Sequence, residues 1–334
     1  MIATGFSYLS PYIDPSSYWF FSFFGLAFPI LLIANILFVI IWSLFKKKYV
    51  LLSLICLILG AGIIPSFIGL RPGNDLSKDE NHIRVISYNM QYLLSIWSKD
   101  KSTYEKNTDK LIKVLQKYGP LDIICAPETN QVGKFSKGLD LEHVKKVPQI
   151  GLAILSRYPI LDTGILDTGE GDQAGAWVDL DYNGTTLRVY GLYLQTNQIS
   201  NATNELAKEV NPKEKRFWDN VGTIVSRYKS SAPMRVKQAK LIKTHAEKCG
   251  HPVLICGDFN DTPNSHVYHI LRKGFQDSFR KKGAGIGTTF GGNLPALRID
   301  YILADPSFKV KKYHTIKNKY SDHYAIFADL EVLL

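Results

Sequence analysis

The hydrophobic pattern divides the chain into an apolar beginning and a longer remainder, in which short apolar runs alternate with polar segments. Residues 15–45 contain no charged side chain, and neither do residues 49–70. A membrane span needs roughly 20 apolar residues, so each stretch is long enough to cross a bilayer. The pattern therefore predicts a membrane anchor at residues 1–71 with two transmembrane helices, at about 18–44 and 49–70.

Two other structures contain such apolar stretches: a buried helical hairpin and a cleaved signal peptide. A soluble core helix rarely stays uncharged over so many residues. A signal peptide has a shorter apolar region, of about 7–15 residues, with basic side chains in front of it. Here the segment before the first stretch carries Asp14 and no Lys or Arg. We therefore favour a retained anchor.

The predicted anchor also has an orientation. Three residues, Lys46, Lys47 and Lys48, form nearly the whole connection between the two stretches. Short positive loops stay in the cytoplasm, and aromatic side chains gather at the ends of spans, as they do here. We therefore expect a multi-pass membrane protein whose larger domain lies outside the cytoplasm, in the periplasm of a bacterium.

The remainder of the chain has the pattern of an α/β domain. A polar, turn-rich segment at 72–82 predicts a linker, and residues 83–334 follow as one domain. Two apolar runs of strand length, at 174–181 and 186–194, flank Asn183-Gly184 and predict a hairpin. Helical spacing marks residues 111–118 and 234–249. Other runs of strand length lie at 83–89, 121–126, 151–156, 252–257, 299–304 and 324–330. This alternation predicts mixed sheets covered by helices.

Polar side chains occur repeatedly where the apolar strands end or begin. Such positions place their side chains on one rim of a sheet, where α/β proteins have their sites. Carboxylate and amide oxygens suit Mg²⁺, and no His-rich or Cys-rich cluster indicates zinc. The residues are Asn89, Glu128, Tyr193, Asp258, Asn260, Asp300, Asp322 and His323.

The net charge of the chain limits the classes of binding partner but does not choose one of them. Residues 1–70 hold three of the 40 Lys and Arg and one of the 30 Asp and Glu, which leaves 37 basic against 29 acidic groups, or +8. This balance favours a polyanion, either nucleic acid or an anionic bilayer, or simply a soluble basic surface. The polar segment 197–233 is either a solvated helix or a lid that faces a membrane. Nothing in the sequence indicates a protein partner.

Five short motifs resemble, in order, those of the endonuclease/exonuclease/phosphatase superfamily, which includes DNase I-like nucleases, AP endonucleases and neutral sphingomyelinases. They are SYN at 87–89, PE at 127–128, GDFNDTP at 257–263, RIDYIL at 298–303 and SDH at 321–323. The resemblance implies a four-layer α/β sandwich of two mixed β-sheets with outer helices. With the anchor in front, the chain resembles a membrane-attached bacterial branch of that group.

The resemblance also implies roles for the polar residues. Glu128, Asn89 and Asp322 would form the metal site, which would hold Mg²⁺, with Mn²⁺ as the alternative. Asp258 would orient or deprotonate the attacking water. Asn260 would hold the phosphate or that water.

The remaining roles concern charge at phosphorus. His323 would stabilise the developing pentacovalent phosphorus, and Asp300 would hydrogen-bond to His323. Tyr193 replaces a histidine found in many members and resembles the AP endonuclease tyrosine, whose hydroxyl contacts phosphate. Pro127 stands where glutamine is common and has no polar side-chain group to make the corresponding contact. Thr288, Thr289 and Arg298 either contact substrate or serve packing and a salt bridge.

Three functions follow from these observations. The first is a membrane-anchored, Mg²⁺-dependent phosphodiesterase that acts on nucleic acid. The alternative is a phospholipid or sphingolipid phosphodiesterase, because the anchor would hold the site near lipid headgroups. A catalytically silent binding module is the third, and the complete set of polar residues argues against it.

Overall fold

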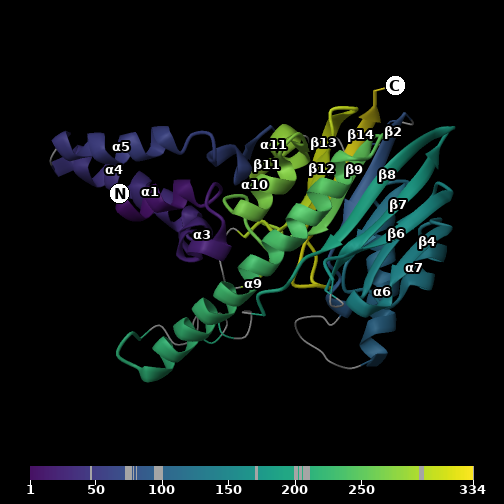
Figure 1. Ribbon diagram of the computed structural model, residues 1–334, viewed down its shortest axis with the longest axis horizontal. Coiled ribbons are helices and arrows are strands. Elements are labelled where there is room, and N and C mark those ends of the chain that lie inside the picture. Colours follow the sequence, from purple (N-terminus) through teal and green to yellow (C-terminus); the bar gives the residue numbers. More distant parts are fainter. Residues whose placement is uncertain are drawn as a thin grey trace.

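A computed structural model describes residues 1–45, 47–71, 77, 79, 81–93, 101–169, 172–198, 202, 205, 211–292 and 297–333. The short apolar runs form two six-stranded sheets that pack face to face (Figure 1). The first has the order β13 (Phe308–Ile316), β14 (Ala325–Val332), β2 (His82–Ser87), β3 (Ile123–Ala126), β5 (Leu152–Ser156) and β4 (His143–Val147). The second has the order β10 (Gln276–Asp277), β12 (Asp300–Ala304), β9 (Val253–Asp258), β8 (Thr185–Tyr193), β7 (Gln173–Tyr182) and β6 (Ile160–Asp167).

Both sheets are mixed. Among the described strands, β2–β3 and β8–β9 are parallel pairs, and the other neighbours in these sheets are antiparallel. The β7–β8 connection is the predicted hairpin, with positive φ at Asn183 (52°) and Gly184 (85°). Glycine has no Cβ and adopts positive φ at little cost, and asparagine tolerates it better than most residues because its short polar side chain bonds locally, which explains the Asn-Gly pair.

Helices complete four layers. Side chains such as Val85 and Val189 fill the core between the sheets. On the outer face of the first sheet lie α6 (Lys101–Gln116) and α7 (Val132–Gly138), and on that of the second lie α9 (Lys215–Glu247) and α10 (His266–Arg272). A short helix, α11 (Ser278–Lys282), follows β10. The predicted α/β fold with two mixed sheets is confirmed.

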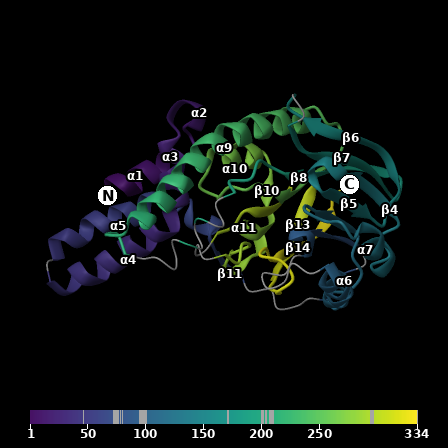
Figure 2. The same ribbon diagram turned by 90° about the horizontal axis from the view of Figure 1, so that it is seen from below.

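One predicted helix is much longer than its pattern indicated. The helical spacing of the sequence placed this helix at 234–249. The structure continues α9 back through Pro233 to Lys215. The first half of α9 projects away from the sheets, on the same side as the N-terminal helices (Figures 1 and 2). The polar segment 197–233 is therefore helical from Lys215 onward.

The apolar beginning of the chain folds into a series of helices. They are α1 (Ile2–Leu9), α2 (Pro15–Tyr18), α3 (Phe20–Leu26), α4 (Phe28–Phe45) and α5 (Val50–Leu59). A 3₁₀ turn at Lys47–Tyr49 joins α4 to α5, which lie side by side (Figures 1 and 2). Strand β1 (Ile68–Leu70) then pairs with β11 (Ala284–Ile286) of the larger domain.

In the described part of the chain, only α4 is long and apolar enough to cross a membrane. Its 18 residues extend about 27 Å, close to the ~30 Å hydrocarbon thickness of a bilayer. Helix α5 has only 10 residues and ends at Gly60, after which a 3₁₀ turn containing Pro65 leads into β1. The prediction of a second spanning helix at 49–70, and of a multi-pass protein, is therefore not supported.

The first predicted span also differs from the structure. The uncharged stretch from residue 18 onward is divided at Trp19 and Ala27, so that α2 and α3 precede α4 as separate helices. Most of the predicted linker 72–82 lies outside the described residues, as does Lys46 of the predicted cytoplasmic connection. The domain boundaries remain a prediction.

Candidate active site

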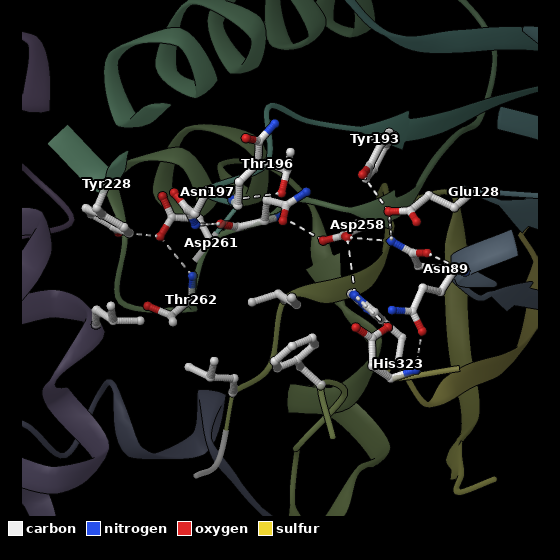
Figure 3. Close-up of a pocket in the computed structure, with 18 residues that line it drawn as sticks. Asn89, Glu128, Tyr193, Thr196, Asn197, Tyr228, Asp258, Asp261, Thr262 and His323 are labelled. Atoms are coloured by element: carbon white, nitrogen blue, oxygen red, sulfur yellow. Dashed lines mark hydrogen bonds and ion pairs between the residues drawn. The ribbon is translucent and has the colours of Figure 1, made fainter. Parts of the chain in front are cut away.

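The predicted site residues come from both sheets and meet at one end of the sandwich. Asn89 follows β2 and Glu128 follows β3, while Tyr193 and Asp258 end β8 and β9. Because each pair of strands is parallel, their carboxyl ends lie at the same edge. Asp300 and His323 reach this edge from antiparallel neighbours, at the start of β12 and just before β14. Figure 3 shows five of these side chains around one pocket.

Asn89 connects the two sheets through hydrogen bonds of its side chain. Its Nδ2 donates to Asp258 Oδ2 (3.0 Å) and to Glu128 Oε1 (3.3 Å). Tyr193 donates its hydroxyl to the same Glu128 oxygen at 2.5 Å. Asn89 and Asp258 are each only 1 % exposed, so these bonds lie in a largely dry environment where they fix side-chain positions.

His323 lies against two carboxylates. Its Nδ1 is 2.9 Å from Asp300 Oδ2, and its Nε2 is 3.8 Å from Asp258 Oδ2. Burial alone would lower the pKa of His323, but Asp300 and then Asp258 raise it to about 10. Burial, with the like charge of Asp300, raises the pKa of Asp258 to about 7 despite the nearby imidazole. The site thus holds an imidazolium beside a carboxylate able to take up a proton near neutral pH.

Two of the polar residues have left-handed backbones. Glu128 has φ 52° and Asn260 has φ 51°, a conformation that costs energy for residues other than glycine. Asn260 is held by its own N–H, which donates to Asp258 Oδ1 (2.8 Å), and by its Nδ2, which donates to Leu194 O (2.9 Å). Such strained positions cluster at functional sites.

Supporting residues were not predicted from the sequence. Ser321 donates its hydroxyl to Asn89 O (2.8 Å) and accepts the His323 N–H (3.0 Å), which ties the SDH loop to β2. Gln91 Oε1 accepts the Asp322 N–H at 3.3 Å. The only signal for Ser321 was its place in the SDH motif, and Gln91 had none.

The structure shows the contacts of two residues for which the sequence left two roles open. Thr289, which the sequence left between substrate contact and packing, accepts the Asp300 N–H on its Oγ1 at 3.1 Å. Arg298 is buried and pairs with Asp277 at 2.6 Å, as the salt-bridge alternative proposed.

The donor set fits a hard divalent cation. Ligand atoms of Asp258, Asp300 and His323 lie within 4.8 Å of one another, and all three residues are buried. Asp300 Oδ1 is buried and has no hydrogen-bond partner within the described residues, which is costly unless another group meets it. Glu128 and Asn89 add further oxygens beside this cluster. Because His323 is protonated and bonded to Asp300, the carboxylate and amide oxygens are the groups here that suit a cation, and such oxygens favour hard ions over zinc.

The pocket at this edge has two contrasting parts. It encloses about 190 Å³, and its polar part holds the catalytic candidates. At its other end, Tyr228 donates to Asp261 Oδ1 (2.9 Å), and the purple N-terminal ribbon lies close by (Figure 3). The apolar lining residues are Leu26, Phe290, Leu297 and Ile299. The described lining residues include no Lys or Arg.

The fold and this cluster define a metal-dependent phosphoester hydrolase. The sequence profile of the endonuclease/exonuclease/phosphatase family matches residues 86–323, and the chain therefore belongs to that family. A second profile, a domain of unknown function (DUF8431), matches residues 1–67. A comparison with curated proteins gave no match.

Solved structures share the fold at low identity. An endonuclease/exonuclease/phosphatase from Bacteroides vulgatus is 19 % identical, with a TM-score of 0.57, over 75 % of this chain and 99 % of that one. A mannosyl-6-phosphatase from Bacteroides thetaiotaomicron is 17 % identical (TM-score 0.52; 74 % and 99 % covered). A D. rerio TDP2 humanized by 14 mutations is 15 % identical (TM-score 0.54; 75 % and 99 % covered). These likenesses show the fold alone.

Proposed function

We propose that the chain hydrolyses a phosphodiester by direct attack of water, with Mg²⁺ as the resident ion and no covalent enzyme intermediate. The observation that carries this proposal is the meeting of Glu128, Asn89, Asp258 and the Asp300–His323 pair in one pocket. The water oxygen bonds to phosphorus, one P–O ester bond breaks, and the leaving alkoxide takes up a proton. The products are a phosphomonoester and an alcohol.

Glu128 and Asn89 would hold the metal ion, and Asp322 would complete the group of polar side chains around it. A divalent cation bound there supplies charge neutralisation and polarises a phosphoryl oxygen. Tyr193 differs from what its resemblance implied, because its hydroxyl donates to Glu128. We assign it to orienting that carboxylate rather than to a phosphate contact.

The other side chains handle water, proton and charge. Asp258 accepts a proton from the attacking water, as its raised pKa near 7 allows, and Asn260 orients that water or the phosphate. His323 donates from Nε2 to the charge that develops at phosphorus. Asp300 holds Nδ1 at 2.9 Å and so fixes the ring and favours its charged form.

The test is hydrolysis of bis(p-nitrophenyl) phosphate by the full chain, with Mg²⁺, Mn²⁺ or EDTA. Hydrolysis should need the metal and should fall by about 10²-fold or more in His323→Ala. His251→Ala is the matched control, because His251 is an exposed histidine outside the site. Metal-independent hydrolysis, or equal rates in the two variants, would contradict the proposal.

Attachment to a membrane is part of the same proposal. The α4–α5 pair exposes large apolar side chains, such as Ile33 (56 %) and Leu59 (69 %), to an extent that water does not favour. We assign this pair to the bilayer, with α4 as the helix that is long enough to cross it.

Nucleic acid is one candidate for this phosphodiester, and the formal net charge of +8 over residues 71–334 supports it. A nuclease should nick supercoiled plasmid with Mg²⁺ and should bind DNA with steep salt dependence. Failure to nick by a chain that hydrolyses the small diester would remove this candidate.

A further inference from the structure

The N-terminal segment reaches into the catalytic pocket. Leu26, the last residue of α3, lines the pocket together with Asp258 and His323. Phe23, one turn earlier, packs on Tyr228 with ring centroids 6.5 Å apart. A Cβ added at Gly25 would lie 2.5 Å from the backbone oxygen of Asn264, so α3 sits directly on the loop that follows β9. One wall of the pocket thus comes from the part of the chain that matches a different family profile.

Buried contacts hold this segment in place on both flanks of the α4–α5 pair. Before it, Asn264 Nδ2 donates to Ser7 O at 2.9 Å, and His266 Nδ1 lies 2.7 Å from Pro11 O. After it, Arg298 Nε donates to Ser66 O at 2.9 Å. Because both flanks contact the same catalytic domain, the α4–α5 pair leaves and returns on one side of that domain.

The pocket suits a phosphoester with an apolar group beside the phosphate. The catalytic groups are polar, whereas Leu26, Phe290 and Leu297 line the same pocket with apolar side chains, and Phe290 packs on His323 with ring centroids 5.2 Å apart. Thr262 also lines the pocket; it is 1 % exposed, and its Oγ1 has no hydrogen-bond partner among the described residues. A nucleic-acid groove contacts successive phosphates through Lys and Arg, and none is among the described lining residues.

The chain leads from Leu26 directly into helix α4, which exposes apolar side chains. Helix α4 begins two residues after Leu26, and its first exposed side chain, Ile30, is 58 % accessible. The projecting half of α9 lies on the same side and presents Trp218, which is 59 % exposed, close to Lys215 (Figures 1 and 2). Aromatic and basic side chains of this kind favour the interface of an anionic bilayer. Leu26 thus lies about one helical turn along the chain from the exposed apolar surface of α4.

The geometry points to residues 1–67 as the lipid-facing wall of the active site, and to a phosphodiester lipid, taken from the bilayer that receives α4 and α5, as the substrate. Leu26 contacts the apolar part of that lipid next to the phosphate, and Thr262 offers a hydrogen bond to its linkage region. Leu26 is thus a specificity-determining residue. This proposal rests on the proposed metal-dependent hydrolysis at the same site.

The experiment compares three diesters that share one headgroup, using the full chain and Mg²⁺, with phosphorus NMR as the readout. They are long-chain phosphatidylcholine in vesicles with phosphatidylglycerol, monomeric short-chain phosphatidylcholine, and glycerophosphocholine, which lacks acyl chains. The variants are Leu26→Asn and Leu26→Met, which differ in polarity at similar size. Bis(p-nitrophenyl) phosphate reports separately on the chemistry.

We expect kcat/KM for the lipids to exceed that for glycerophosphocholine by tenfold or more. Leu26→Asn should lower this ratio about tenfold, and Leu26→Met should keep it within about twofold. Equal hydrolysis of the chainless diester, or an equal loss for both substrate types in Leu26→Asn, would overturn the proposal. If only bis(p-nitrophenyl) phosphate is hydrolysed, the lipid inference fails and the proposed function stands. If no diester is hydrolysed, the proposed function fails as well.

The source of the lipid is tested on α4, away from the pocket. The double variant Ile33→Asp and Leu37→Asp places two charges on exposed apolar positions of that helix. It should release the chain from floating vesicles and slow hydrolysis of vesicle lipid, while monomeric short-chain lipid is hydrolysed at the original rate. Unchanged flotation and vesicle rate would contradict bilayer delivery.

Discussion

Replacing Tyr193 by phenylalanine separates two roles for this residue. The sequence resemblance implied a contact between its hydroxyl and phosphate, whereas in the structure the hydroxyl donates to Glu128 Oε1 at 2.5 Å. Tyr193→Phe removes this hydrogen bond and leaves Asn89, at 3.3 Å, as the remaining described donor to that oxygen. Burial, followed by the negative charge of Glu128, raises the pKa of Tyr193 far above its usual range, so the hydroxyl keeps its proton at working pH.

The expected magnitude follows from the kind of bond that is lost. A hydrogen bond to a charged group contributes about 1.5–3 kcal/mol, and each ~1.4 kcal/mol is a factor of ten. Residues that orient metal ligands change metal affinity by about 10–100-fold when they are replaced. We therefore expect the half-saturating Mg²⁺ concentration of Tyr193→Phe to rise by about 10–100-fold, and excess Mg²⁺ to restore most of the rate.

The assay is the rate of bis(p-nitrophenyl) phosphate hydrolysis across a Mg²⁺ titration, with calorimetric measurement of Mg²⁺ binding beside it. Tyr190→Phe is the control, because Tyr190 lies on the same strand and its hydroxyl contacts His245 (2.7 Å) instead of the site. The reasoning is refuted if Mg²⁺ affinity is unchanged while KM for the diester rises and excess Mg²⁺ does not rescue it. That result would restore the phosphate-contact role.

Further predictions concern stability and metal. Asp277→Ala leaves the Arg298 guanidinium buried and without its ion-pair partner, which should lower the free energy of unfolding by about 3–5 kcal/mol. The melting temperature should fall by roughly 6–20 °C. Arg216→Ala is the control, because it breaks an exposed ion pair and should change the melting temperature little. Burial raises the pKa of Asp277, but Arg298 outweighs it and holds the pKa below its ordinary value. The pair's stabilisation is thus complete above about pH 4 and is lost as the pH falls through the lowered pKa. The melting difference between wild type and Asp277→Asn should therefore stay constant down to about pH 4 and shrink below it; a difference that widens there would contradict this sign. EDTA should abolish hydrolysis and added Mg²⁺ should restore it, and a rate that survives chelation would exclude a metal-dependent site.

The sequence predicted the interior of each sheet but not its edges. Central strands such as Val253–Asp258 are buried on both faces and so appear as continuous apolar runs. The four edge strands of these sheets, β13, β4, β10 and β6, were all missed. Their sequences include polar and charged residues, such as HVKKV in β4, because edge strands use charge to avoid pairing with other chains. Runs of this kind do not differ from loops in hydrophobicity alone.

The candidate site could be predicted because chemistry is concentrated at strand ends. Asn89, Glu128 and Asp258 each follow an apolar run directly, and the motif order placed His323 with them. Leu26 could not be predicted, since it lies in an apolar stretch and reaches the pocket only through tertiary packing of α3. The missed end of α5 is a different kind of error, because Gly60 and Pro65 were visible breaks within an otherwise apolar run.

The most direct test of the site is the rate of Mg²⁺-dependent diester hydrolysis by Asp258→Asn beside the wild type. Asp258 contacts both Asn89, at 3.0 Å, and His323, at 3.8 Å, and asparagine keeps its shape while removing the proton acceptor. We predict a loss of at least about 10²-fold in rate, with a cooperative melting transition retained. A folded Asp258→Asn protein that hydrolyses the diester within a few-fold of the wild-type rate would contradict the proposed mechanism.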